Sequence, residues 1–397
     1  MGRGRLCHAG VAALVLLFAT PALLGGPVEG GSGPAFSPGL CPGGELSIEG
    51  AVPVLQVAGP PEVIGRAYGA LLGEQVRYLR AQYLDRIIGT GHLRRLAVEM
   101  ARPMERHILE RYLRELGALA DVAGESREDV LLTATFLDVY RSLSCTAFVA
   151  TPPATAGEPL LARNLDFPTF GVAQRYSMVA VYHPQGLHSF LSVSWPGLPG
   201  VVSGMNESGL VLVMLEVSDP DQGLDGVPYQ LLYRQVLEEC DTARGAEELI
   251  RRAPRTTANN VVLLDGDGDS AVLEVTRSAV VRRGLETGVL CATNYFRARA
   301  PSGAWPCRRY QTVSRELARL HGRLGAVQAA EVLAMVHQGP LTMQSMIFEP
   351  GAMRVHLALG APPTTLRPYV TLDAGRLFRW RPTERARQGP KVNRDTN

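Results

Sequence analysis

Ser144-Cys145-Thr146-Ala147-Phe148 is followed, after one turn, by Leu161-Ala162-Arg163-Asn164-Leu165-Asp166. The apolar run from Cys145 and the run from Leu160 onward are typical of strands, and the Thr-Pro-Pro-Ala-Thr-Ala-Gly stretch at 151–157 supplies turn residues. The pattern predicts a β-hairpin with Cys145 at its leading end. In such a hairpin Arg163 and Asp166 can reach the thiol, because the start of one strand lies beside the end of its partner. A thiol beside a fixed cation is a candidate nucleophile.

This segment resembles the cysteine-type N-terminal nucleophile (Ntn) hydrolases, the group that contains penicillin acyltransferase, choloylglycine hydrolase and the acid ceramidase-like amidases. In that superfamily the precursor cuts itself immediately before a Cys that is followed by a hairpin carrying Arg-Asn-x-Asp. Here the matching residues are Cys145, Arg163, Asn164 and Asp166. The resemblance continues through Gly65, Gly69 and Gly73-Glu74 upstream, and through Gly204-Met205-Asn206-Glu207-Ser208-Gly209-Leu210, Thr293-Asn294-Tyr295-Phe296 and Arg308-Arg309-Tyr310 downstream.

The resemblance implies an α+β fold, the four-layer αββα sandwich of the Ntn hydrolases, and a site without metal or organic cofactor. A cut before Cys145 gives this residue a free α-amino group with a reference pKa of about 7.7 to 8.0, beside a thiol at about 8.5. One residue then carries both nucleophile and base. Arg163 is expected to favour the thiolate, and Asp166 to orient the amino group by hydrogen bonding.

Two further site residues come from the resemblance. Asn294 is expected to donate to the oxyanion that forms when an amide carbonyl is attacked. Arg308 takes the position of a site arginine, and Arg309 is its alternative because the register is uncertain by one residue. The chain departs from the bile-salt hydrolases at Glu216, where those enzymes place an Asn. A carboxylate cannot donate to an oxyanion unless it is protonated, so this departure weakens the transfer of bile-salt activity.

Bulk composition indicates a globular protein with ample core material. The chain has 397 residues, 46% of them apolar, and a formal charge of +2 with acidic and basic residues interspersed. Nothing in this balance indicates nucleic acid or an acidic membrane as a partner. The basic start and the apolar run from Val11 to Leu24 predict a signal peptide, and hence a secreted or periplasmic protein with no membrane association after the signal is removed.

The predicted organisation is a signal peptide at 1–26, a Gly/Pro-rich linker at 27–44, an N-terminal helical segment at 45–144 and an Ntn hydrolase core at 145–397. Apolar spacing of three and four predicts helices between Pro61 and Arg141. After Cys145 we predict strands at 176–182, 190–194, 210–217, 355–359 and 369–372, a hairpin at 260–265 and 271–275, and helices at 228–240, 243–252, 305–324 and 326–337. Asn206 to Gly209 is predicted to be a β-turn.

Of the six cysteines, Cys41, Cys240, Cys291 and Cys307 remain once Cys7 and Cys145 are assigned. A Cys291–Cys307 disulfide and buried free thiols are both consistent with the sequence. The alternating acids from Asp265 to Asp269 depart from the EF-hand template, so we interpret them as a polar hairpin loop.

The sequence therefore predicts a self-processing cysteine hydrolase that cleaves a linear amide, with the two cleaved chains remaining associated. Three alternatives stay open: an acyltransferase that passes the acyl group to an amine, a papain-type protease using His183, His188 or His337, and a non-catalytic binding protein on the same fold.

Overall fold

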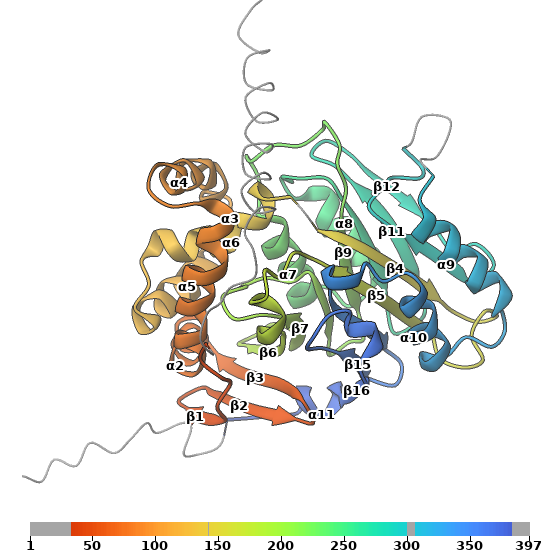
Figure 1. The fold of residues 1–397 in the computed structure, drawn as a ribbon, viewed down its shortest axis with the longest axis horizontal. Coiled ribbons are helices and arrows are strands. Elements are labelled where there is room, and N and C mark those ends of the chain that lie inside the picture. The colour runs from red at the N-terminus through yellow and green to blue at the C-terminus, as the bar shows by residue number, and fades with distance from the viewer. Residues whose placement is uncertain (1–32, 142, 300–305, 383–397) are drawn as a thin grey trace, which may run out of the picture.

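Two β-sheets packed face to face form the centre of the protein (Figure 1). The structure is a computed structural model that describes residues 33–141, 143–299 and 306–382. The larger sheet contains, in spatial order, β1 (Gly39–Cys41), β2 (Gly44–Glu49), β3 (Val52–Gly59), β6 (Met178–Pro184), β7 (Phe190–Ser194), β8 (Ser203–Asn206), β9 (Val211–Glu216), β10 (Asn259–Leu264), β11 (Ser270–Val275) and β12 (Val280–Arg283). The smaller sheet contains β13 (Val289–Ala292), β4 (Ser144–Ala150), β5 (Leu160–Asp166), β14 (Thr342–Glu349), β15 (Arg354–Ala358) and β16 (Val370–Asp373).

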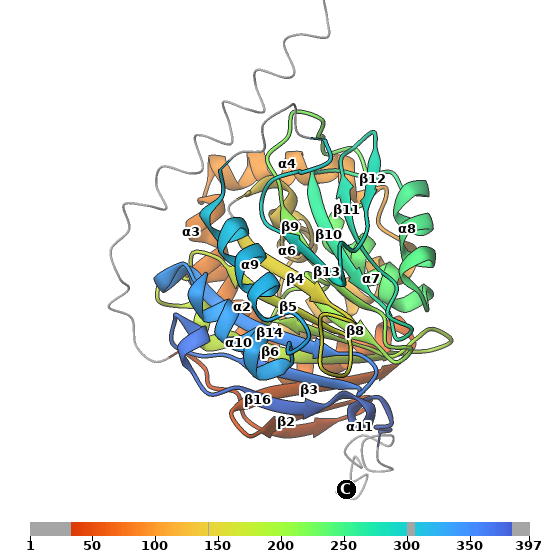
Figure 2. The same ribbon diagram turned by 90° about the vertical axis from the view of Figure 1, so that its right-hand side faces the viewer.

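Helices pack against both sheets and complete four layers (Figure 2). The smaller sheet is covered by α9 (Arg308–Arg319) and α10 (Ala326–Met335), and the larger by α2 (Pro61–Leu79), α7 (Tyr229–Glu239) and α8 (Ala243–Arg252). α5 (Glu110–Ala123) packs on α2, which continues into η1 (Arg80–Leu84) and α3 (Asp85–Ile88). α6 (Arg127–Val139) packs on α5 and on α4 (His92–Glu105). Short elements are η2 (Ala173–Tyr176), η3 (Gly339–Leu341), η4 (Thr364–Leu366) and α11 (Ala374–Phe378). The predicted α+β, four-layer αββα sandwich of the Ntn hydrolases is confirmed.

Side-chain alternation along β4 separates two cores. Phe148 and Ala150 pack with α9 and α10 in the smaller core, whereas Cys145, Ala147 and Val149 belong to the larger core between the sheets. Successive side chains of a strand point to opposite faces, so the thiol of Cys145 necessarily lies on the inter-sheet side.

The evenly spaced glycines of α2 allow a close approach of α5. A Cβ atom added at Gly65 would lie 2.1 Å from the carbonyl oxygen of Glu115, and one at Gly69 would lie 3.0 Å from that of Leu119. Only glycine fits at the first of these positions without a shift of the backbone. The glycine spacing therefore sets how α5 packs on α2.

The N-terminal part differs from the predicted linker and helical segment. Residues 39–41 and 44–59 form three strands at one edge of the larger sheet, and the helices begin only at Pro61. Gly/Pro-rich composition concealed the short β1, and the β2–β3 hairpin preceded the region with helical spacing. The predicted signal peptide at 1–26 and the first part of the linker lie outside the described residues.

The other predicted elements are present, most of them with shifted ends, and four further strands were not predicted. These are β8, β12, β13 and β14. β8 is only four residues long, and β14 carries Gln344 and Ser345 in a central, fully buried position that hides the apolar signature of a strand. The predicted helix at 305–324 is α9, with residue 305 outside the described part of the chain.

Two smaller expectations are also resolved. The five described cysteines are all free, so Cys291 and Cys307 are buried thiols and not a disulfide. In the loop after β10, Asp265 accepts hydrogen bonds from the backbone N–H groups of Asp267 and Asp269, as expected of a polar hairpin loop. Among the described helices, none has the length and apolar character needed to cross a bilayer.

Candidate active site

Cys145 is completely buried at the leading end of β4, in the uncut chain. Its Sγ accepts a hydrogen bond from Nη2 of Arg163 at 3.1 Å and another from the backbone N–H of Asp166. Burial raises the pKa of the thiol, and the Arg163 guanidinium opposes that shift. The thiol is therefore held by donors that favour the thiolate, while its complete burial favours the neutral thiol.

Arg163 bridges the two sheets. It belongs to β5, opposite Ala147 of β4, and its side chain is fully buried. Nη1 donates to the carbonyl of Val202 and to Oγ of Ser203, which begins β8 in the larger sheet. These contacts fix the guanidinium so that Nη2 points at the thiol. The predicted proximity of Arg163 to Cys145 is present in the structure.

The carboxylate of Asp166 lies on the other face of the hairpin. Asp166 is the strand partner of Ser144, one residue before Cys145. Its carboxylate accepts hydrogen bonds from Thr342 Oγ1 and, at 2.8 Å, from Nε2 of Gln338. Burial nevertheless raises its pKa. Asp166 thus meets the thiol through its backbone N–H, while its carboxylate faces the side chains around Ser144.

Asn294 forms hydrogen bonds to the chain on both sides of the Ser144–Cys145 bond. Its Oδ1 accepts the backbone N–H of Cys145 at 2.8 Å, and its Nδ2 donates to the carbonyls of Leu143 at 3.1 Å and Glu216 at 2.8 Å. In the uncut chain Asn294, and not Asp166, holds the nitrogen that would become the amino group of Cys145.

Arg309 occupies the position expected of the site arginine, and Arg308 does not. Nη1 of Arg309 donates to the carbonyl of Cys145 and, at 2.9 Å, to Thr146 Oγ1. Nη2 donates to Oδ1 of Asn294 at 2.9 Å and to Oγ of Ser144 at 3.2 Å. Arg308 is exposed at the start of α9. The correction has a geometric reason: consecutive helix residues point about 100° apart, so only one of the pair faces the hairpin.

Glu216, the departure noted in the sequence, anchors the residues ahead of Cys145. Its Oε1 pairs with Nε of Arg141 at 3.2 Å, and its Oε2 accepts the backbone N–H of Leu143 at 3.1 Å. Arg141 also donates to the carbonyls of Val217 and Ala258. The carboxylate is used here as an acceptor, which an Asn could supply only at one oxygen.

Buried polar residues of the larger sheet hold the loop that carries Asn294. Nδ2 of Asn260 donates to the carbonyls of Thr293 at 2.8 Å and Tyr295 at 3.0 Å. The fully buried carboxylate of Glu274 accepts the backbone N–H groups of Ala298 and Arg299 at 2.8 and 2.9 Å. No sequence signal singled out Asn260, Glu274 or Gln338. Their roles depend on contacts with segments that are distant along the chain.

The three histidines of the papain alternative have partners away from the thiol. His183 lies between Ser189 and Gln56, and burial lowers its pKa to about 4. His188 pairs with Asp241, and the ring of His337 accepts the N–H of Gly339. The contacts of Cys145 with Arg163 and Asn294 favour the Ntn arrangement.

Part of the chain matches a known family model. Residues 154–337 match the family model described as acyl-coenzyme A:6-aminopenicillanic acid acyl-transferase. The matched segment is a little under half of the chain; it begins nine residues after Cys145 and includes Arg163, Asp166, Asn294 and Arg309.

Relatives of known sequence match a little over half of the chain. An uncharacterized protein of Archaeoglobus fulgidus is 25% identical over 260 residues, which are 56% of this chain and 43% of that protein. Protein dcd1B of Dictyostelium discoideum is 25% identical over 257 residues, 58% of this chain and 51% of its own length. The chain thus spans about half the length of the curated relatives it matches.

Several solved structures are similar to part of this chain. An N-acylethanolamine-hydrolyzing acid amidase ortholog of Caenorhabditis elegans is 19% identical, with a TM-score of 0.44, covering 57% of this chain and all of that one. A conjugated bile acid hydrolase mutant of Clostridium perfringens is 14% identical, with a TM-score of 0.42, covering 58% and 93%. Penicillin V acylase of Agrobacterium tumefaciens is 16% identical, with a TM-score of 0.37, covering 54% and 83%.

Proposed function

We propose that the chain cuts itself between Ser144 and Cys145 and that the new N-terminal cysteine hydrolyses a linear amide of a small molecule. One observation carries the proposal. The thiol of Cys145 is buried against Arg163, while its backbone nitrogen is held by Asn294 at 2.8 Å. Both atoms that an N-terminal nucleophile uses are therefore positioned before any cut is made.

Self-cleavage would begin with attack of the Cys145 sulfur on the carbonyl carbon of Ser144. The S–C bond forms, the C–N bond breaks, and the thiol proton passes to the departing nitrogen, which becomes the α-amino group. Water then hydrolyses the resulting thioester, which frees the carboxylate of Ser144 and restores the thiol. The contacts of Glu216 with Leu143 and of Arg309 with Ser144 hold the chain ahead of the bond during this sequence.

Hydrolysis of a substrate amide would use the same thioester chemistry, with the α-amino group of Cys145 as the base and its sulfur as the nucleophile. The α-amino group takes the thiol proton, the sulfur attacks the amide carbonyl, and the amine leaves with that proton. Nδ2 of Asn294, which donates to the carbonyl of Leu143 in the uncut chain, would be free to donate to the oxyanion once this segment has moved away. Water completes the reaction on the thioester.

The proposed hydrolase and the alternative acyltransferase differ in the acyl acceptor, which is water in the first and an amine in the second. The matching family is described as an acyl-transferase, which favours an amine acceptor as the second candidate. We propose hydrolysis as the main activity, since it requires only water at the thioester. Product analysis with and without an added amine separates the two, because transfer converts the acyl group to a new amide and hydrolysis to the free acid.

The proposal includes export through the N-terminal signal and continued association of the two cleaved chains. The test is intact-mass analysis of the purified wild-type protein, with N-terminal sequencing of its fragments. Two chains, one beginning at Cys145, support self-processing. A folded wild type that stays uncut counts against the Ntn mechanism and favours the binding-protein alternative.

A matched pair of substitutions tests the arginine at the site. Arg309→Met is expected to slow self-cleavage by about 10- to 100-fold, because hydrogen bonds to a charged group contribute about 1.5 to 3 kcal/mol. Arg308→Met, one residue earlier and exposed, is expected to leave the rate within about twofold, as is usual for exposed surface positions. The rates are followed by the loss of the full-length mass with time. Equal rates for the two variants would show that Arg309 does not act on the scissile segment.

A further inference from the structure

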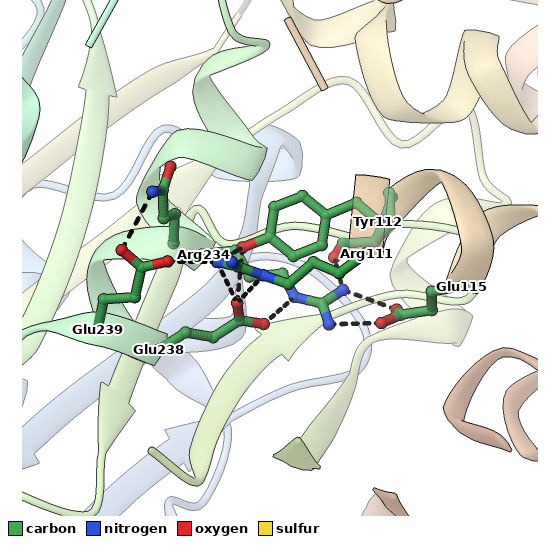
Figure 3. Close-up of polar contacts among 8 residues, drawn as sticks. Arg111, Tyr112, Glu115, Arg234, Glu238 and Glu239 are labelled. Carbon is green, nitrogen blue, oxygen red and sulfur yellow. Dashed lines mark hydrogen bonds and ion pairs between the residues drawn. The ribbon is translucent and has the colours of Figure 1, made fainter. Parts of the chain in front are cut away.

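Arg234 of α7 is the centre of a buried cluster of charges (Figure 3). Its side chain is 2% exposed. Nη1 and Nη2 donate to the two carboxylate oxygens of Glu115 at 2.7 and 2.6 Å, and Nε donates to Glu238 at 2.8 Å. Nη1 also donates to the carbonyl of Pro199 at 2.9 Å. Four of the five N–H groups of the guanidinium thus donate to α5, α7 or the loop before β8.

The cluster joins parts of the chain that lie on opposite sides of Cys145. Tyr112 and Glu115 belong to α5, which precedes the proposed cut, whereas Arg234 and Glu238 belong to α7, which follows it. The hydroxyl of Tyr112 donates to Glu238 at 2.7 Å, and Arg111 donates to Glu238 at 3.1 Å and to Glu239 at 2.6 Å. Figure 3 shows these side chains converging between the two helices.

Aromatic rings enclose the buried cation. The guanidinium carbon of Arg234 lies 4.7 Å from the ring centre of Tyr112 and 4.6 Å from that of Tyr182. The ring of Phe190 lies 5.6 Å away. Tyr112 comes from the N-terminal segment, whereas Tyr182 and Phe190 come from the central sheet. A cation held between rings from both segments is attracted by each of them when the segments are joined.

Buried ion pairs contribute specificity more readily than stability. Apolar residues of the same volume often stabilise a core equally well, but the removal of one charged partner from a buried pair costs about 3 to 5 kcal/mol, because the other charge is left without compensation. The N-terminal segment also joins the core through β3, which pairs with β6 in the larger sheet, and through apolar contacts of its helices. Apolar packing has little directional preference, whereas the charge cluster is a directional contact between α5 and α7.

We propose that the Arg234 cluster is the lock that retains the N-terminal segment on the core after the chain has been cut at Cys145. The inference rests on the proposed self-cleavage. Before the cut, the covalent link through residues 140–144 keeps the segment at a high effective concentration whatever its contacts. After the cut, retention depends on non-covalent contacts alone, and Glu115 is the carboxylate that the departing segment contributes to Arg234.

The test uses the full-length protein with Glu115→Gln or Arg234→Met, after self-cleavage has gone to completion. The fraction of the N-terminal chain that stays bound to the chain beginning at Cys145 is measured by size-exclusion chromatography and native mass spectrometry over a dilution series. We expect the dissociation constant between the chains to rise by about 100-fold or more, the equivalent of the cost of breaking a buried pair. Each substitution is also made in Cys145→Ala protein, where the uncut segment is expected to stay in place and the fold to persist.

Asp225→Asn is the matched control. Asp225 pairs with Arg106 and His107, which follow α4, so this contact also crosses the cut, but the side chains of Asp225 and Arg106 are 49% and 64% exposed. An exposed pair contributes little, and the chains of this variant are expected to stay together as in the wild type. If the chains of Glu115→Gln and Arg234→Met also remain together, the inference about the Arg234 cluster is overturned, while the proposed function still stands. So would loss of folding in the uncut Cys145→Ala background, since the cluster would then serve the fold and not the junction. A wild type that is never cut overturns the proposed function and the lock with it.

Discussion

Cys145→Ala is expected to remain a single, folded, uncut chain without amidase activity. The substitution removes the sulfur that attacks Ser144 and leaves Arg163 and Asn294 in place. Loss of the nucleophile in a hydrolase of known mechanism lowers the turnover rate on the order of 10⁶-fold, so residual activity should fall below detection. The measurement is intact mass over several days at neutral pH, followed by an assay against a panel of linear amides.

Cys291→Ala supplies the control for this prediction. Cys291 is a second buried cysteine, on the strand that pairs with β4, where it lies opposite Phe148. Its replacement should cost about 1 kcal/mol of unfolding free energy, the usual value for a small core change, and leave self-cleavage unaffected. A Cys145→Ala protein that still yields a fragment beginning at residue 145 would show that another group, or a contaminating protease, makes the cut.

The hairpin, its basic residue Arg163 and its acidic residue Asp166 were predictable because they lie close to Cys145 in the sequence. Cys145, Arg163 and Asp166 lie on paired strands joined by one turn, and turn chemistry fixes that pairing locally. Asn294 was found through its Thr-Asn-Tyr motif. The choice between Arg308 and Arg309 was not predictable, because it depends on the rotation of α9 against β4, which no local pattern encodes.

The remaining site residues escaped the sequence for a different reason. Glu216 was noticed only as an anomaly, since its partners Arg141 and Leu143 are more than 70 residues away along the chain. Gln338 lies 194 residues from Ser144, to which its Nε2 donates at 2.7 Å. A buried polar residue on a strand resembles a break in an apolar pattern until its distant partner is placed. The same holds for β14, whose polar Gln344 and Ser345 interrupt the signature of a central strand.

Asn294→Asp is expected to slow self-cleavage by about 10- to 100-fold at neutral pH, because two carbonyl oxygens next to the scissile segment lose their donor, and an unsatisfied buried polar group costs about 1 to 3 kcal/mol. The amide is required in one orientation. Its oxygen accepts from Cys145 and Arg309, and its nitrogen faces the carbonyl oxygens of Leu143 and Glu216. An ionised aspartate retains the first two contacts but points its second oxygen at two carbonyls, which repels the chain ahead of the scissile bond.

The pH dependence of this variant separates a donor role from simple packing. Below the pKa of the new carboxyl group, the second oxygen carries a proton and can donate to one of the two carbonyls, so cleavage of Asn294→Asp should recover as the pH falls. Asn294→Ala lacks any such group and should stay slow at every pH. Cleavage rates from pH 4 to 8, each divided by the wild-type rate at the same pH, make the comparison. Parallel profiles for the two variants would mean that the side chain fills space beside Cys145 without donating.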